Sequence, residues 1–66
     1  MNIKLNGKDC ELAGSVTIAG LLETHGIIGK RIAVEVNEAV LPRSEHSQYQ
    51  LRENDCVEII SAIGGG

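Results

Sequence analysis

The chain has 66 residues, a formal net charge of −3, 42% hydrophobic residues and a single aromatic side chain, Tyr49. This length predicts one domain with a small core. Six scattered Lys and Arg residues and one aromatic ring argue against a nucleic-acid partner. The sequence contains neither an apolar run approaching the roughly 18 residues of a membrane span nor an apolar signal peptide near its start, so we expect a cytoplasmic protein without a membrane partner.

The first twelve residues predict a β-hairpin. Asn6-Gly7 is the strongest two-residue hairpin turn, because both positions tolerate positive φ. The expected pairs are Leu5 with Lys8, Ile3 with Cys10 and Met1 with Leu12 on a mainly apolar face, and Lys4 with Asp9 and Asn2 with Glu11 on a polar face. The apolar face must therefore pack against another element.

Residues 15–26 predict the helix that covers this hairpin. Ser15 or Thr17 can cap its start, and Gly26 suits a left-handed stop. Gly20 weakens the helix by about 1 kcal/mol relative to Ala, so packing must hold it. Ile18, Leu21, Leu22 and His25 recur at the spacing of one helix face. We interpret His25 as a surface residue near the helix end.

A second hairpin is predicted over residues 32–41. Apolar residues alternate from Ile32 to Val36, a turn follows at Asn37-Glu38, and a short strand ends before Pro42. The polar segment 44–55 is interpreted as a connector rather than a site. In it Ser44 could cap a single helical turn, Tyr49 and Leu51 could pack over the core, and Asn54-Asp55 marks a turn.

Residues 56–63 predict a last strand that is apolar on both faces toward its end. Val57, Ile59 and Ile63 share one face with Ser61, whereas Cys56, Ile60 and Ala62 share the other with Glu58. One interpretation is a central strand. The other is an open face on which a partner docks, and the two are compatible. The residues that we expect at the docking surface are Ile60, Ala62 and Ile63.

The cysteine and histidine residues form no metal-binding pattern. Cys10 and Cys56 lie far apart, and His25 and His46 are equally isolated. We expect free thiols that serve as small apolar side chains, and no metal site. The sequence shows no combination of acid, base and nucleophile that would indicate a stand-alone enzyme.

The chain ends in three glycines, Gly64, Gly65 and Gly66, directly after the last predicted strand. If extended, they present about 10 Å of backbone without side chains, ending in an ionised carboxylate that can attack the α-phosphate of ATP. A frayed terminus or a linker is the alternative, but no polar spacer separates the glycines from the strand. We therefore expect a domain over residues 1–63 and a flexible tail over residues 64–66.

The order of these segments resembles the ubiquitin-like β-grasp sulfur carriers, and among them the ThiS family of thiamine biosynthesis. The resemblance covers the whole chain and is carried by "IKLNGK", "TIAGLL", "VEVNEAVLPRSE" and "ENDCVEIISAIGGG". It implies an α+β fold in which a mixed sheet of four or five strands packs on one main helix, with the first and last strands adjacent and parallel. Asn37-Glu38 stands where Asn-Gly is common in the family, and no aromatic residue precedes the tail.

The resemblance further implies a carrier rather than an enzyme, with no bound cofactor. A ThiF-like adenylyltransferase would use ATP and magnesium to adenylate Gly66. Sulfur from a donor such as a cysteine desulfurase would then replace AMP to give a thiocarboxylate. A ThiG-like thiazole synthase would accept the sulfur for the thiazole ring. Gly64 and Gly65 would deliver the reactive end, and the free carrier would be a monomer.

Three alternatives stay open from the sequence. The small subunit of molybdopterin synthase also ends in Gly-Gly and delivers sulfur, although that family is longer. A ubiquitin-like modifier would be joined through Gly66 to lysines of its targets. A non-covalent β-grasp binding module would keep its function after the tail is deleted.

Overall fold

Two hairpins and one helix form as the sequence predicts. The computed structural model describes residues 1–27 and 31–61. Its elements are the strands β1 (Asn2–Leu5) and β2 (Lys8–Glu11), the helix α1 (Ile18–Thr24), the strands β3 (Ile32–Val36) and β4 (Ala39–Leu41), the short 3-10 helix η1 (Arg43–Glu45) and the strand β5 (Cys56–Ser61). Both hairpin turns have positive φ, at Asn6 (52°) and Gly7 (82°) and at Asn37 (52°) and Glu38 (71°).

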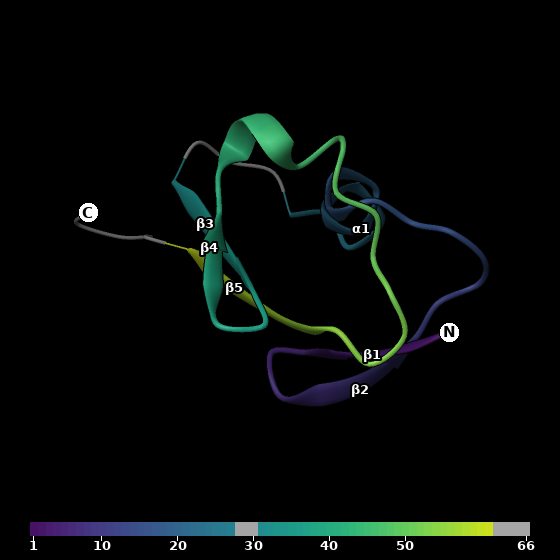
Figure 1. Cartoon of the computed structure of the whole chain (residues 1–66). Helices are drawn as coiled ribbons and strands as arrows, with labels where there is room; N and C mark the ends of the chain where they lie inside the picture. The colour runs from purple at the N-terminus through teal and green to yellow at the C-terminus, as the bar shows by residue number, and fades with distance from the viewer. Residues whose placement is uncertain (28–30, 62–66) are drawn as a thin grey trace.

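The five strands form one mixed sheet in the order β2-β1-β5-β3-β4 (Figure 1). The register of β1 with β2 is the predicted one, with Ile3 opposite Cys10. β5 runs parallel to β1 and antiparallel to β3, so it is a central strand. The predicted α+β fold, with its first and last strands adjacent and parallel, is confirmed.

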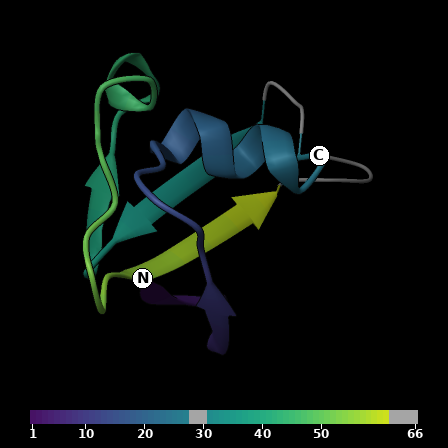
Figure 2. The same ribbon diagram turned by 90° about the vertical axis from the view of Figure 1, so that its right-hand side faces the viewer.

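The helix α1 covers one face of this sheet (Figure 2). Thr17 is its N-cap, since the Thr17 Oγ1 accepts a hydrogen bond of 3.1 Å from the backbone N–H of Gly20. Ile18 and Leu21 are fully buried. The buried core lies between helix and sheet and consists of Ile3, Ile18, Leu21, Val34, Val36, Leu51 and Val57.

The connector between β4 and β5 differs in one detail from the prediction. Ser44 does not cap the helical turn, because η1 begins one residue earlier at Arg43 and follows Pro42, which makes no side-chain capping bond. Pro42 has φ −59° and ψ 147°, an extended conformation outside the turn, so Arg43 is the first helical residue. Leu51 is buried and Tyr49 is half-buried against the core, as predicted.

Candidate docking surface on the tail-bearing strand

A buried carboxylate fixes the start of β5. Asp55 is only 6% exposed. Its oxygens accept hydrogen bonds from Asn37 Nδ2 (3.0 Å), the Tyr49 hydroxyl (3.1 Å) and the backbone N–H of Arg52 (2.9 Å). The pKa of Tyr49 is raised above its ordinary value. Burial is the largest cause, and the hydrogen bond to Asp55 and the negative charge of Asp55 add to it. Tyr49 therefore keeps its proton and remains a hydrogen-bond donor at neutral pH. Asp55 thus ties the β3–β4 turn and the connector to the residue that precedes β5.

Both turn asparagines also hold β5 directly. Asn37 Oδ1 accepts a hydrogen bond of 2.9 Å from the backbone N–H of Cys56. Asn6 Oδ1 accepts one of 2.8 Å from the backbone N–H of Ile59. Each hairpin therefore contributes a side chain, besides its ladder, to the position of the strand that leads into the tail.

The two faces of β5 are exposed to different degrees. Val57 is 1% exposed and Ile59 is half-buried, both on the side of the helix. Cys56, Glu58 and Ile60 are exposed on the other side, where no helix covers the sheet. In its described part, β5 is central and one of its faces is open, whereas the docking of a partner on that face stays a prediction.

Two large hydrophobic side chains are exposed among the described residues, and both lie on the open face. They are Val40, 69% exposed, and Ile60, 51% exposed. Ala33 lies opposite Ile60, and Glu35 lies between Val40 and Glu58 across neighbouring strands. We call this group, Ala33, Glu35, Val40, Glu58 and Ile60, the open-face patch.

Of this patch, the sequence predicted Ile60 alone. Val40 was missed, although a signal for it exists: the turn at Asn37-Glu38 fixes the register that places Val40 opposite Glu35 on the polar side of the hairpin. The acidic pair was missed because it depends on the non-local pairing of β3 with β5, in which Glu35 lies opposite Glu58.

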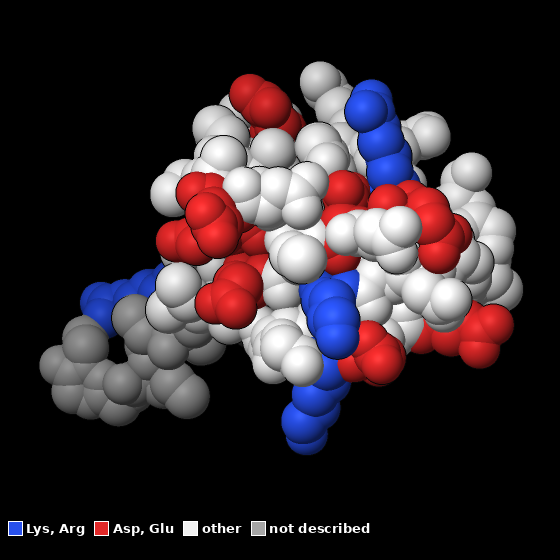
Figure 3. Space-filling view, turned by 60° about the horizontal axis from the view of Figure 1, so that its bottom comes forward, with Lys and Arg blue, Asp and Glu red and all other residues white. Residues whose placement is uncertain are grey.

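The open face carries more acidic than basic side chains. Asp9, Glu11, Glu35 and Glu58 lie on this face with Lys4. Figure 3, in which the bottom of Figure 1 comes forward, shows Asp and Glu side chains in several groups with fewer Lys and Arg side chains among them. At the β1–β2 side, Lys4 Nζ lies 3.0 Å from Asp9 Oδ1, and the hydrogen bond to Asp9 raises the pKa of Lys4. Lys4 is thus already paired with an acid.

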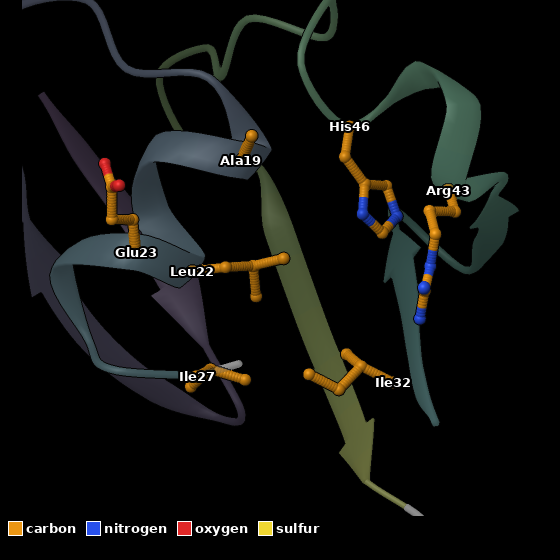
Figure 4. A pocket seen from close by; sticks show the side chains of 7 residues that line it. All are labelled: Ala19, Leu22, Glu23, Ile27, Ile32, Arg43 and His46. Atoms are coloured by element: carbon orange, nitrogen blue, oxygen red, sulfur yellow. The ribbon is translucent and has the colours of Figure 1, made fainter. Parts of the chain in front are cut away.

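On the opposite side of the sheet, a pocket of about 320 Å³ opens between α1, β3 and η1. Figure 4 shows Leu22, Ile27 and Ile32 as its apolar walls, with Arg43 and His46 at one side. His46 is 9% exposed, and its Nε2 lies 3.2 Å from the carbonyl oxygen of Leu41. This pocket adjoins the end of β5, because Ile32 pairs with Ser61.

The remaining predicted site residues, Ala62, Ile63 and the three glycines Gly64, Gly65 and Gly66, lie outside the described residues. Cys10 is a half-buried free thiol against the core, as expected, whereas the free thiol of Cys56 is exposed. In residues 1–27 and 31–61, no group of three or more His, Cys, Asp or Glu side chains is placed to hold a metal ion. Nor does any helix of these two stretches have the length and hydropathy needed to cross a membrane.

Comparison with known proteins gives one consistent family. The model of the ThiS family matches residues 3–66. The sulfur carrier protein ThiS of Bacillus subtilis is 31% identical over 65 residues, which cover 97% of this chain and 98% of that protein. The crystal structure of the thiamine biosynthesis protein ThiS from Geobacter metallireducens superimposes with a TM-score of 0.84 at 30% identity and full coverage of both chains. The β-grasp fold is thereby confirmed.

A longer relative contains a segment that is similar to this chain. Thiazole synthase of Paramagnetospirillum magneticum is 33% identical over 66 residues, which are the whole of this chain but 20% of that protein. The chain therefore spans about a fifth of the length of this relative.

Proposed function

This chain belongs to the ThiS family, and we propose that it is a cytoplasmic sulfur carrier of thiamine biosynthesis whose working group is the carboxylate of Gly66. Its similarity to the sulfur carrier protein of Bacillus subtilis over nearly the whole of both chains carries this proposal. The chain acts as a carrier on which other enzymes work, and it needs no cofactor of its own.

The proposed chemistry has two steps, the first at the α-phosphorus of ATP and the second at the carboxyl carbon of Gly66. A carboxylate oxygen of Gly66 attacks the α-phosphorus of ATP, bound with magnesium in a ThiF-like adenylyltransferase, and pyrophosphate leaves. A thiol reductant releases sulfide from the persulfide of a donor such as a cysteine desulfurase and is oxidised to a disulfide. The sulfide then attacks the acyl carbon, and AMP leaves with its electron pair. The product is a thiocarboxylate, whose sulfur is a stronger nucleophile than the oxygen that it replaces.

The side-chain-free tail suits this chemistry. Gly64 and Gly65 have no Cβ atoms, so this part of the chain, if it is extended, would fit a narrow channel in a partner enzyme. Ile60 with Ala62 and Ile63 is the proposed docking surface beside this tail. The exposure of Ile60 on an uncovered sheet face supports that role.

A ThiG-like thiazole synthase is the proposed acceptor. The thiazole synthase of Paramagnetospirillum magneticum includes a segment similar to the whole of this chain. A carrier and an acceptor within one polypeptide meet at high effective concentration, which fits two proteins that exchange sulfur. This observation favours thiazole formation over the molybdopterin alternative.

Mass spectrometry of the C-terminal fragment tests the proposal. The chain is incubated with the ThiF-like enzyme, ATP, magnesium and sulfide, and we expect one oxygen to be replaced by sulfur at Gly66. Fragmentation is required because oxidation of Met1 changes the intact mass by nearly the same amount. A chain shortened by Gly65 and Gly66 is the control and should remain unmodified. An unmodified wild-type carboxylate, with an enzyme shown to be active, would contradict the carrier function, and lysine conjugates would indicate a protein modifier.

A further inference from the structure

His46 is a buried side chain that the proposed function does not use. Its ring Nε2 donates a hydrogen bond of 3.2 Å to the carbonyl oxygen of Leu41, at the end of β4. Its own backbone carbonyl oxygen accepts one of 2.8 Å from the N–H of Ala19 in α1. The ring is therefore held between β4 and α1. Its second nitrogen, Nδ1, has no hydrogen-bond partner in residues 1–27 and 31–61.

This second nitrogen faces the pocket between α1, β3 and η1. Every fully buried side-chain nitrogen or oxygen atom of the described residues has a hydrogen-bond partner, so the unpaired Nδ1 is reached by solvent. His46 lines the pocket, and Figure 4 shows one ring nitrogen directed into it, on the side of Leu22, and the other directed toward Arg43. Nδ1 is therefore available to a ligand in the pocket.

Arg43 places a positive charge at the same end of the pocket. The backbone N–H of His46 donates a hydrogen bond of 3.0 Å to the carbonyl oxygen of Arg43, as in a 3-10 turn, where residues three apart lie above one another. Both side chains line the pocket. Glu23 lines it too, but Figure 4 shows its carboxylate turned away from Arg43 and His46. This end of the pocket is therefore basic.

The other walls of the pocket are apolar. Leu22, Ile27 and Ile32 are half-buried, and each of them lines the pocket. The volume of about 320 Å³ lies at the lower end of the range of about 300–1,000 Å³ that small-molecule sites occupy. Apolar walls with a few fixed polar groups are typical of such sites, because the walls supply affinity and the polar groups fix the orientation of the ligand.

A carboxyl group on a short branched hydrocarbon matches both parts of the pocket. The planar N–H groups of a guanidinium suit the two oxygens of a carboxylate. A carboxylate also accepts a hydrogen bond from Nδ1 of a protonated ring, and a protonated carboxyl group donates one to Nδ1 of a neutral ring. We infer that this pocket is a binding site for small apolar carboxylic acids, with the carboxyl group at Arg43 and His46 and the hydrocarbon against Leu22, Ile27 and Ile32.

This site goes beyond the proposed function, and its test needs no partner enzyme. The isotope-labelled full chain is titrated with isocaproate and followed by NMR. We expect saturable shifts of the amide signals of Leu22, Ile32 and His46 with a Kd of about 1 mM, as for other ligands of this size. Isocaproamide has the same shape without the charge and should bind about tenfold more weakly. Equal binding of the acid and the amide would overturn the inference.

Two variants remove the polar groups one at a time. His46→Gln keeps a side-chain donor for the Leu41 carbonyl but has no group in place of Nδ1, so we expect about fivefold weaker binding. Arg43→Gln should weaken binding about tenfold. Arg52→Gln is the matched control, because Arg52 is exposed, lies outside the pocket and carries the same charge. Equal weakening by Arg43→Gln and Arg52→Gln would indicate an effect of net charge and overturn the site.

The unliganded spectrum of each variant shows whether its fold persists. If a variant does not fold, the comparison of the acid with the amide on the wild-type chain still decides the inference.

A second pocket of the same volume is an internal control. It lies between β2 and α1 and is lined by Cys10, Leu12, Val16 and His25, among others, but by no Lys or Arg. Without a cation it should not select the acid over the amide. Shifts of the Val16 and His25 signals as large as those around His46 would show unspecific binding to apolar surface and overturn the inference.

A chain without Gly64, Gly65 and Gly66 identifies the source of the carboxylate. We expect it to bind isocaproate with the wild-type affinity and to show the same unliganded pocket signals. Tighter binding together with shifted pocket signals would show that the chain's own C-terminus occupies the pocket, which would overturn the assignment to a small molecule. Because no sulfur chemistry enters these measurements, a negative result leaves the carrier function intact.

Discussion

The helix-covered face and the open face of the sheet are built from the same alternating strands, yet they hold different kinds of residues. The covered face places Val34, Val36 and Val57 in the core, each less than 7% exposed. The open face places Glu35 and Glu58 between these core positions, in the same two strands. One strand can therefore specify the fold with every second residue and leave the others on the uncovered face.

Truncation of a covered residue should have the largest effect on stability. Leu21→Ala, at a position that is 1% exposed, is expected to lower the free energy of unfolding by about 2–5 kcal/mol, because it leaves a cavity under α1. Val40→Ala on the open face is the comparison variant and should change stability by less than about 0.5 kcal/mol. Urea unfolding measures both. Similar losses would contradict the division between the two faces.

Removal of the buried carboxylate should come next. Asp55→Ala leaves the donors of Asn37, Tyr49 and Arg52 without their acceptor, and we expect a loss of about 2–3 kcal/mol in the free energy of unfolding. Asp55→Asn retains one acceptor oxygen and should lose less. Asp9→Ala, with a side chain that is 87% exposed, is the control. Equal effects of Asp9→Ala and Asp55→Ala would show that burial of the Asp55 network is unimportant.

Truncation of Ile60 should separate binding from stability. Ile60→Ala is expected to change the free energy of unfolding by less than about 0.5 kcal/mol. It should raise the KM for adenylation by about tenfold, equivalent to about 1.4 kcal/mol of binding. Cys56→Ala, at the opposite end of β5 on the same face, should leave the KM unchanged. A loss of stability without a change in KM would assign Ile60 to the fold.

The smallest expected effect is a gain in stability from a substitution in the helix α1. Gly20→Ala should stabilise the fold by about 0.5–1 kcal/mol, since alanine favours the helix and its Cβ would lie 3.4 Å from Thr17 Oγ1 and 3.6 Å from Val16 Cγ1, which is ordinary contact. Gly7→Ala should have the opposite sign, because Gly7 has a φ of 82°. Thermal unfolding of both variants checks the pair. Destabilisation by Gly20→Ala would show that the helix requires a closer approach than these distances indicate.

The sequence predicted the local features of this fold well, because local chemistry determines them. Asn6-Gly7 specifies a two-residue turn, and the turn fixes every pair of β1 with β2. The Thr17 cap and the burial of Leu21 follow from helical spacing in the same way. The parallel placement of β1 beside β5 came from the family resemblance, since no periodicity within one segment determines it.

The features that the sequence did not predict depend on contacts between distant segments. The sequence around Asp55 predicts only a turn. The burial of Asp55 depends on its hydrogen bonds to Asn37 and Tyr49, which come from other segments of the chain. The Asn6 amide oxygen accepts a hydrogen bond from Ile59, 53 residues later in the chain. Ile60 is exposed, but its docking role stays a prediction, as do the docking roles of Ala62 and Ile63 and the roles of Gly64, Gly65 and Gly66.

The place of β5 between the two hairpins has a consequence for how the chain folds. The β1–β2 hairpin and the β3–β4 hairpin do not pair with each other, and β5 alone joins them in the sheet. Each hairpin can form from neighbouring residues. The five-stranded sheet is complete only when β5 pairs with both hairpins, and β5 follows both of them in the chain. Pairing β1 with β5 joins residues about 50 positions apart, a contact of the kind that slows folding. Completion of the sheet and placement of the strand that leads to the tail are therefore one event, so a half-folded chain presents no correctly positioned tail to an enzyme.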